Sequence, residues 1–151
     1  MEIKPEELIY KLQNAAPLPQ TNLIVVHGEE DYYRQQIVTA LPEAIFAGVA
    51  PEDRAITVFD KDTDLNELAS VINTYPFFSG QSLIVLKDEK LLAAKAESEA
   101  RKQQLDKLAD VLADIPDYCT VLVTASKLDK RTKLFKALKK QALLANASAS
   151  S

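Results

Sequence analysis

The stretch LIVVHGEEDYYR, which starts at Leu23, joins an apolar run to a glycine and then to a helical pattern. A strand, a glycine and a helix N-terminus form the usual setting of a phosphate-binding loop, which also needs free backbone amides, a lysine and a magnesium-binding hydroxyl. Here Gly28 is followed directly by three acids, Glu29, Glu30 and Asp31. Their carboxylates favour the helix dipole but repel a polyphosphate. The stretch therefore predicts a capped, acidic helix start rather than a nucleotide site.

A second acidic pair, Asp88 and Glu89, follows the apolar run LIVL. Its spacing resembles the acidic pair that holds magnesium and water in ATPases. The alternative function is therefore a P-loop-like NTPase or nucleotide-binding domain that uses Asp88 and Glu89. Without a phosphate loop such a pair has nothing to act on, so the sequence favours a capping role for these acids.

Residue types suited to other catalytic chemistry are scarce. His27 is the one histidine and Cys119 the one cysteine, so the sequence offers no pair of such residues for a metal site and no internal disulfide. Cys119 lies in the apolar stretch YCTVLVTA and is predicted to be a small buried residue. His27 ends an apolar run and is predicted to be a hydrogen-bonded structural residue. We expect no catalytic residue, no metal and no cofactor.

The charge of the chain is uneven. Residues 127–140 hold seven basic residues and one acid, a balance of +6, within a chain of net charge −4. The remaining residues hold 11 basic and 21 acidic groups, a balance of −10. Such a basic helix is usually a solvated face, but contact of Lys130, Arg131, Lys133 and Lys136 with DNA or a partner stays open. We expect DNA contact to be weak or indirect.

The stretch NTYPFFSGQS places two phenylalanines at the end of a helical pattern. Pro76 disfavours helical geometry at Tyr75, and Gly80 permits a tight turn into the next apolar run. Phe77 and Phe78 therefore lie near a turn and point in different directions. Either both rings fill a gap between helix and sheet, or they form an exposed hydrophobic anchor, which in a protein interface can contribute about 2 kcal/mol or more.

The elements that position these residues alternate along the chain. Short β-branched runs predict strands covered on both faces, at residues 23–28, 55–60, 82–88 and 119–126. Amphipathic segments predict helices at residues 5–13, 31–41, 64–73, 91–113 and 130–144. This order predicts an α/β fold of three layers, a parallel sheet with helices on both faces.

Length and composition agree with one domain. The chain has 151 residues, 47% of them apolar and 26% charged, as in an ordinary soluble protein. No apolar run approaches the ~18 residues of a membrane span, and the first residues do not resemble a signal peptide. We therefore expect a cytoplasmic protein without membrane contact. Residues 1–144 are predicted to form the domain, and residues 145–151, without large apolar side chains, a disordered tail or an added end.

Three segments together resemble a known family: LIVVHGEEDYY, INTYPFFSGQSLIVLKDEK and TVLVTASKLDKRTKLFKALKK. In order and spacing they are similar to the N-terminal domain of the delta subunit of the bacterial DNA polymerase III clamp loader. The resemblance covers nearly the whole chain, to about Leu144. It implies an AAA+, P-loop-NTPase-like fold whose phosphate loop has degenerated, and hence a subunit that does not hydrolyse ATP.

The resemblance also implies a partner and a site. In the family, this domain binds and opens the ring-shaped sliding clamp, the beta subunit, through a hydrophobic pair at a helix end. That pair aligns with Phe77 and Phe78, with Tyr75 and Pro76 beside it. The family often has an aliphatic residue at the first position, where this chain has Phe77.

Members of the family are also longer than this chain. They add a second small AAA+ module and a helical collar, which joins delta to the tau/gamma and delta prime subunits. We therefore expect a non-catalytic fragment of a DNA replication subunit, within a nucleotidyltransferase complex. Such a fragment can bind a clamp but cannot assemble a loader.

Overall fold

A computed structural model describes residues 1–19, 21–95 and 97–148. Within these residues the chain forms a six-stranded parallel sheet in the order β1-β6-β2-β5-β4-β3. The strands are β1 (Glu2–Ile3), β2 (Leu23–His27), β3 (Ala55–Phe59), β4 (Ser82–Leu86), β5 (Cys119–Ala125) and β6 (Leu143–Asn146). The four strands expected from the sequence are all present, and β1 and β6 are additional. Cover on both faces, expected for all four, does not hold for β3, because it is the edge strand and leaves Ile56 and Val58 exposed.

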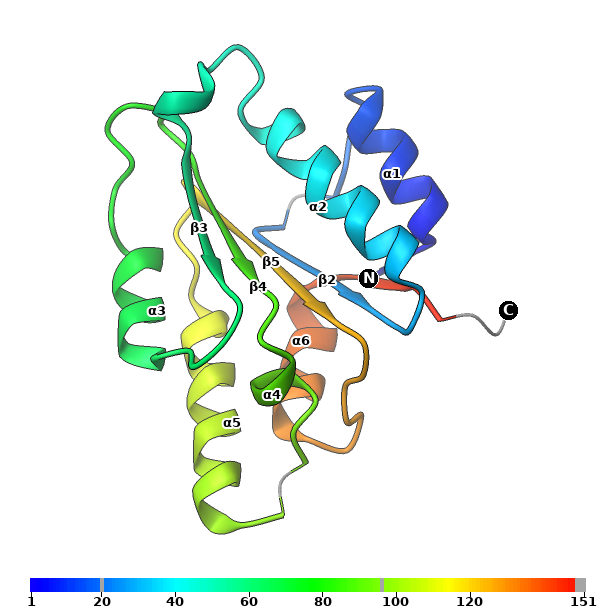
Figure 1. The fold of residues 1–151 in the computed structure, drawn as a ribbon, viewed down its shortest axis with the longest axis vertical. Helices are drawn as coiled ribbons and strands as arrows, with labels where there is room; N and C mark the ends of the chain where they lie inside the picture. The colour runs from blue at the N-terminus through cyan, green and yellow to red at the C-terminus, as the bar shows by residue number, and fades with distance from the viewer. Residues whose placement is uncertain (20, 96, 149–151) are drawn as a thin grey trace.

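Helices cover both faces of this sheet (Figure 1). They are α1 (Pro5–Gln13), α2 (Asp31–Ile45), α3 (Leu65–Ile72), α4 (Glu89–Leu92), α5 (Glu99–Ala113) and α6 (Lys133–Gln141), with a short 3-10 helix, η1 (Pro51–Asp53). One apolar cluster lies between the sheet and α1 and α2, and the other between the sheet and α3, α5 and α6. This arrangement confirms the expected three-layer α/β fold.

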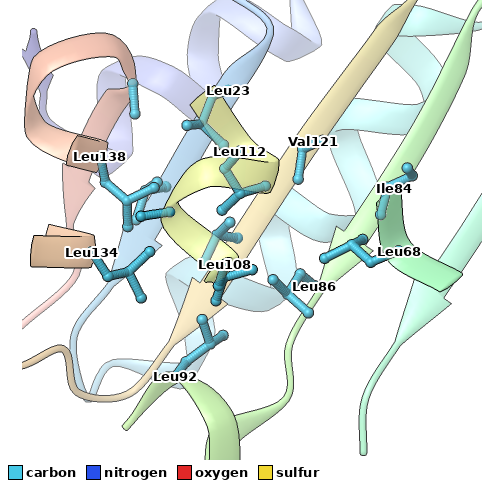
Figure 2. Packing of buried hydrophobic residues seen from close by; sticks show 14 of the residues in the cluster. Leu23, Leu68, Ile84, Leu86, Leu92, Leu108, Leu112, Val121, Leu134 and Leu138 are labelled. Atoms are coloured by element: carbon cyan, nitrogen blue, oxygen red, sulfur yellow. The ribbon is translucent and has the colours of Figure 1, made fainter. Parts of the chain in front are cut away.

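The central strands owe their place to continuous apolar sequence. Every residue of β4 is buried, and alternate residues of β5 enter opposite clusters. Val121 and Val123 face the side of the sheet that carries α3, α5 and α6, whereas Leu122 faces the side that carries α1 and α2, because side chains alternate across a strand. Figure 2 shows Val121 among leucines of α3, α5 and α6. Both faces of the central strands are therefore covered by apolar side chains of the helices.

The helix expected over residues 91–113 is two helices. Asp88 caps α4 by accepting a hydrogen bond from the amide of Leu91, and Ser98 caps α5 in the same way from Arg101. Two N-cap residues specify two helix starts, so the continuous helix was a wrong prediction.

Among the described residues no helix is both long and apolar enough to cross a membrane.

The C-terminal segment also differs from the expectation. Helix α6 ends at Gln141, and residues 143–146 form β6 between β1 and β2. Ala145 and Ala147 are fully buried, so the expected end of the domain at residue 144 and a tail from residue 145 do not hold for residues 145–147. This segment is ordered although it lacks large apolar side chains after Leu144, because β6 pairs with β1 on one side and β2 on the other. Residues 149–151 of the expected tail lie outside the described residues.

Candidate functional site

The loop after β2, where a phosphate loop would lie, is filled by the chain itself. Gly28 has a φ of +132°, and a Cβ at this position would lie 2.3 Å from the carbonyl carbon of Ala147. The amide of Glu30 donates to the carbonyl oxygen of Ala147 at 2.8 Å, so this amide is not available to a phosphate. Glu30 occupies the N-cap of α2 without a side-chain capping bond. The acidic helix start is confirmed, and the side-chain cap is not found.

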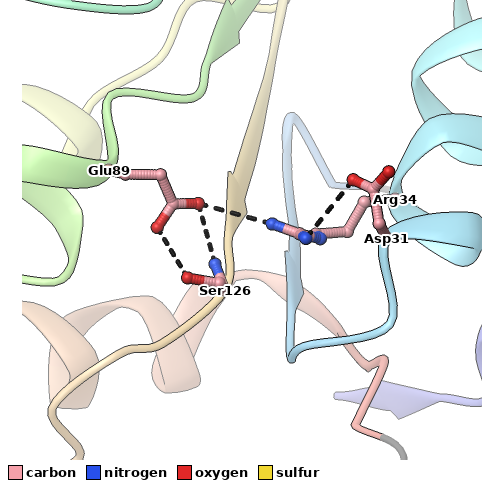
Figure 3. Close-up of polar contacts among 4 residues, drawn as sticks. All are labelled: Asp31, Arg34, Glu89 and Ser126. Atoms are coloured by element: carbon pink, nitrogen blue, oxygen red, sulfur yellow. Dashed lines mark hydrogen bonds and ion pairs between the residues drawn. The ribbon is translucent and has the colours of Figure 1, made fainter.

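Glu89 joins the ends of two strands rather than facing an open site (Figure 3). Its carboxylate accepts hydrogen bonds from the amide of Ser126 at 2.9 Å and from the Ser126 hydroxyl at 2.8 Å. It also accepts one from Arg34, 3.4 Å away, whose guanidinium lies at the same distance from Asp31. Glu89 therefore acts as a tie between the β5 end and the start of α2.

Asp88 is almost fully buried, at 3% exposure. One carboxylate oxygen accepts from the hydroxyl and amide of Thr63, at 2.7 and 3.1 Å, and the other from the amide of Leu91, at 3.2 Å. Burial alone would raise the pKa of Asp88, but these hydrogen bonds outweigh it and leave the pKa below its usual value. The capping role expected for Asp88 is confirmed.

The remaining candidates for chemistry are structural. Within the described residues His27 shows no side-chain hydrogen bond, contrary to expectation, and instead meets Phe135 edge-on at 6.1 Å. Burial, and then the charge of Lys130, lowers the pKa of His27. Cys119 is fully buried, which raises the pKa of its thiol. No group of three or more acids, histidines or cysteines within the described residues could hold a metal ion.

The basic residues lie on and before α6, which follows the carboxyl end of β5. Lys130, Arg131, Lys133 and Lys136 are all exposed. Arg131 donates to Asp129 at 3.1 Å, and this hydrogen bond lowers the pKa of the Asp129 carboxyl. The lysines of α6 form no ion pair with any described residue.

The aromatic turn between α3 and β4 is the most apolar exposed feature of the described chain. Phe77 is 86% exposed and Phe78 is 89% exposed, so neither ring fills a gap between helix and sheet. Tyr75 is 49% exposed, whereas Pro76 is buried beneath the turn. The amide of Gly80 donates to the carbonyl oxygen of Pro76 at 2.8 Å and closes the turn. Of the four predicted contact residues, three are therefore exposed and Pro76 is not.

A ring that sequence reasoning did not single out, that of Tyr118, contacts Tyr75 of the turn. Tyr75 meets Phe77 edge-on, with ring centroids 5.2 Å apart and an interplanar angle of 74°. On its other side it meets Tyr118 at 5.2 Å and 72°. Tyr118 comes from the segment just before β5, distant in sequence, so no local pattern could reveal this contact. Tyr75, Phe77, Phe78 and Tyr118 are called the aromatic cluster below.

The aromatic cluster lies at the amino ends of the strands, whereas Asp88 and Glu89 lie at their carboxyl ends. The turn precedes β4 and so lies at its amino end, which is the green connection from α3 in Figure 1. Asp88, Glu89 and Gly28 follow β4 and β2 and lie at the carboxyl ends. The structure therefore brings Tyr75, Phe77 and Phe78 to one turn, at the opposite end of the strands from the segment 127–133, which follows β5.

Comparison with known proteins gives one consistent family. The family described as DNA polymerase III, delta subunit, matches residues 25–148. The DNA polymerase III subunit delta of Bacillus subtilis is 27% identical over 125 residues, which make up 81% of this chain and 36% of that protein.

Two solved structures share the fold. The Bacillus subtilis DNA clamp loader delta protein has a TM-score of 0.70 and 22% identity, over 95% of this chain and 42% of that one. A gamma subunit-related protein of Thermotoga maritima has a TM-score of 0.58 and 12% identity, over 96% of this chain and 46% of that one. The chain thus spans less than half the length of each of these relatives.

Proposed function

Because the chain belongs to the DNA polymerase III delta subunit family, we propose that it is a clamp-binding unit that docks on the sliding clamp through Phe77 and Phe78. The observation that carries the proposal is the exposure of both rings, 86% and 89%, at one turn. Binding at this turn is the step by which the clamp would be held and opened during DNA replication.

The physical argument rests on burial of the two rings in a partner. Fully burying a phenylalanine side chain contributes about 1.5–3 kcal/mol, so two rings in an apolar pocket supply a substantial share of a specific interface. Tyr75 extends the same apolar surface. Pro76 is buried and the Pro76–Gly80 hydrogen bond closes the turn, so the backbone of the turn is ordered before the partner arrives.

We further propose that the unit neither binds nor hydrolyses ATP. Three observations at the carboxyl ends of the strands support this. The backbone of Ala147 fills the space beside Gly28, and its carbonyl oxygen accepts a hydrogen bond from the amide of Glu30. The carboxylate of Glu89 accepts hydrogen bonds from Arg34 and Ser126. A nucleotide site using Asp88 and Glu89 would have to break these bonds. Saturable ATP binding at micromolar concentration in calorimetry would contradict this part of the proposal.

The other partners belong to the longer protein. The chain covers 36% of the curated delta subunit, so assembly with tau/gamma and delta prime subunits is proposed for the remainder of such a protein. We propose the cytoplasm as its location and weak or indirect DNA contact through Lys130, Arg131 and Lys133, which are exposed and follow the carboxyl end of β5, whereas the turn precedes the amino end of β4.

A double substitution tests the clamp contact. Phe77→Ala combined with Phe78→Ala removes both rings, and we expect the Kd for the cognate clamp to rise at least about thirtyfold, since one anchor residue contributes about 2 kcal/mol. The matched control is Tyr10→Ala with Tyr32→Ala, two rings that are each 63% exposed on α1 and α2. The control should bind like the unsubstituted chain. A double variant that keeps its circular dichroism spectrum and its affinity would sink the proposed contact.

A further inference from the structure

Phe77 is connected to the hydrophobic core through two other rings. Tyr118 is partly buried and packs against the core cluster on the α3, α5 and α6 side of the sheet. Tyr75 lies between Tyr118 and Phe77, with 5.2 Å between ring centroids on each side. We propose that Tyr118 is a positioning residue for clamp binding, which holds Tyr75 and through it the exposed ring of Phe77. This inference rests on the proposed function.

The backbone at Tyr118 is fixed by the sheet. Its carbonyl oxygen accepts a hydrogen bond from the amide of Ser82, the first residue of β4, at 2.8 Å. The next residue, Cys119, begins β5, pairs with Ser82 and is fully buried. Tyr118 therefore stands on a rigid element at the point where the aromatic turn enters the sheet. A ring placed there can act as a support for a neighbouring loop.

The turn alone does not hold the ring of Phe77. Among the described residues none accepts a hydrogen bond from the amides of Phe77 and Phe78. An exposed side chain exchanges rotamers within nanoseconds, and fixing it on binding costs free energy. Both contacts of Tyr75 fall within the favoured edge-to-face range of aromatic pairs, 4.5–7 Å. The contacts of Tyr118 with Tyr75, and of Tyr75 with Phe77, therefore favour one orientation of the Phe77 ring before the clamp binds.

The two phenylalanines differ in this respect. Phe77 has a ring contact with Tyr75, whereas Phe78 has none with the described residues. Loss of the ring at position 118 should therefore act on Phe77 and leave Phe78 unaffected. This asymmetry separates a positioning role from a general effect on the fold, which would weaken both contacts alike.

The test compares Tyr118→Leu with Tyr118→Phe in the full 151-residue chain. Leucine keeps an apolar contact with the core and removes the ring edge, so we expect the Kd for the clamp to rise about two- to tenfold. Phenylalanine keeps the ring. Because the described residues offer the Tyr118 hydroxyl no hydrogen-bond partner, Tyr118→Phe should bind like the unsubstituted chain. Tyr75→Leu, at a half-exposed position, should reproduce the loss and serves if Tyr118→Leu folds poorly.

A double-mutant cycle gives the decisive comparison. With Phe77→Ala in place, Tyr118→Leu should cause no further loss of affinity, whereas with Phe78→Ala in place it should keep its full effect. Equal losses in both backgrounds, or no loss with Tyr118→Leu, would overturn the positioning role. If the Phe77→Ala and Phe78→Ala double variant binds the clamp normally, the proposed function itself fails. Loss of binding in that variant combined with unchanged binding of Tyr118→Leu overturns the positioning role alone.

Discussion

The carboxylate of Asp88 illustrates, at the scale of one residue, how an acid can be buried and remain ionised. Three hydrogen-bond donors, the amide and hydroxyl of Thr63 and the amide of Leu91, stabilise the charged form against the cost of burial. The same bonds join the segment after β3 to the start of α4. The acid that the NTPase alternative would use to hold magnesium thus has the structural role that the sequence favoured.

The low pKa of Asp88 predicts how its contribution to stability depends on pH. The folded pKa lies below the usual value near 4, so the contribution is present above that pH and is lost as the pH falls through the folded pKa. Asp88→Asn should lower the free energy of unfolding by about 1–3 kcal/mol at pH 7, as measured by urea denaturation. The difference from the unsubstituted chain should shrink as the pH falls below the usual value of an aspartate pKa. Asp60→Asn, at an exposed acid, is the control, and a difference for Asp88→Asn that is independent of pH would refute the explanation.

At the scale of elements, β6 and the loop after β2 depend on each other. The backbone of Ala147 passes so close to Gly28 that no Cβ fits between them, and it bonds to the amide of Glu30. Gly28→Ala should therefore lower the free energy of unfolding by about 3 kcal/mol or more, because it adds a steric clash to the strain of a positive φ. Gly48→Ala is the matched control, since Gly48 also has a positive φ but has open space around it, and it should cost about 1 kcal/mol. Equal costs in chemical denaturation would contradict the packing of β6 against this loop.

The elements also show why part of the fold could be predicted and part could not. The strands at residues 23–27, 55–59, 82–86 and 119–125 have apolar, β-branched sequence, which indicates a strand locally, although the edge strand at residues 55–59 is exposed on one face. Strand β6 follows α6 directly, and its leucines continue the apolar pattern of the helix, so the sequence suggested one longer helix. Its role comes from pairing with β1 and β2, which are distant in sequence. Long-range pairing of this kind has no local signal.

At the scale of the whole molecule, the carboxyl and amino ends of the strands expose different kinds of side chain. Open α/β sheets usually bind ligands at the carboxyl ends of the strands. Here Glu89, just after β4, accepts hydrogen bonds from Ser126 and Arg34, whereas the exposed aromatic turn lies at the amino end of β4. The sequence identified the aromatic turn from Pro76 and Gly80 but left the direction of the rings open. Their exposure, and the support from Tyr118, required the three-dimensional arrangement.

The account predicts where a bound clamp protects the chain. Hydrogen–deuterium exchange, measured for the free chain and at saturating cognate clamp, should show rapid exchange at residues 77–79 in the free chain, because their amides have no acceptor among the described residues. With the clamp bound, exchange at residues 77–79 should slow markedly, while exchange at residues 127–133, after the carboxyl end of β5, stays unchanged. Unchanged exchange at residues 77–79 in a chain that has bound the clamp would contradict the central claim that Phe77 and Phe78 make the contact.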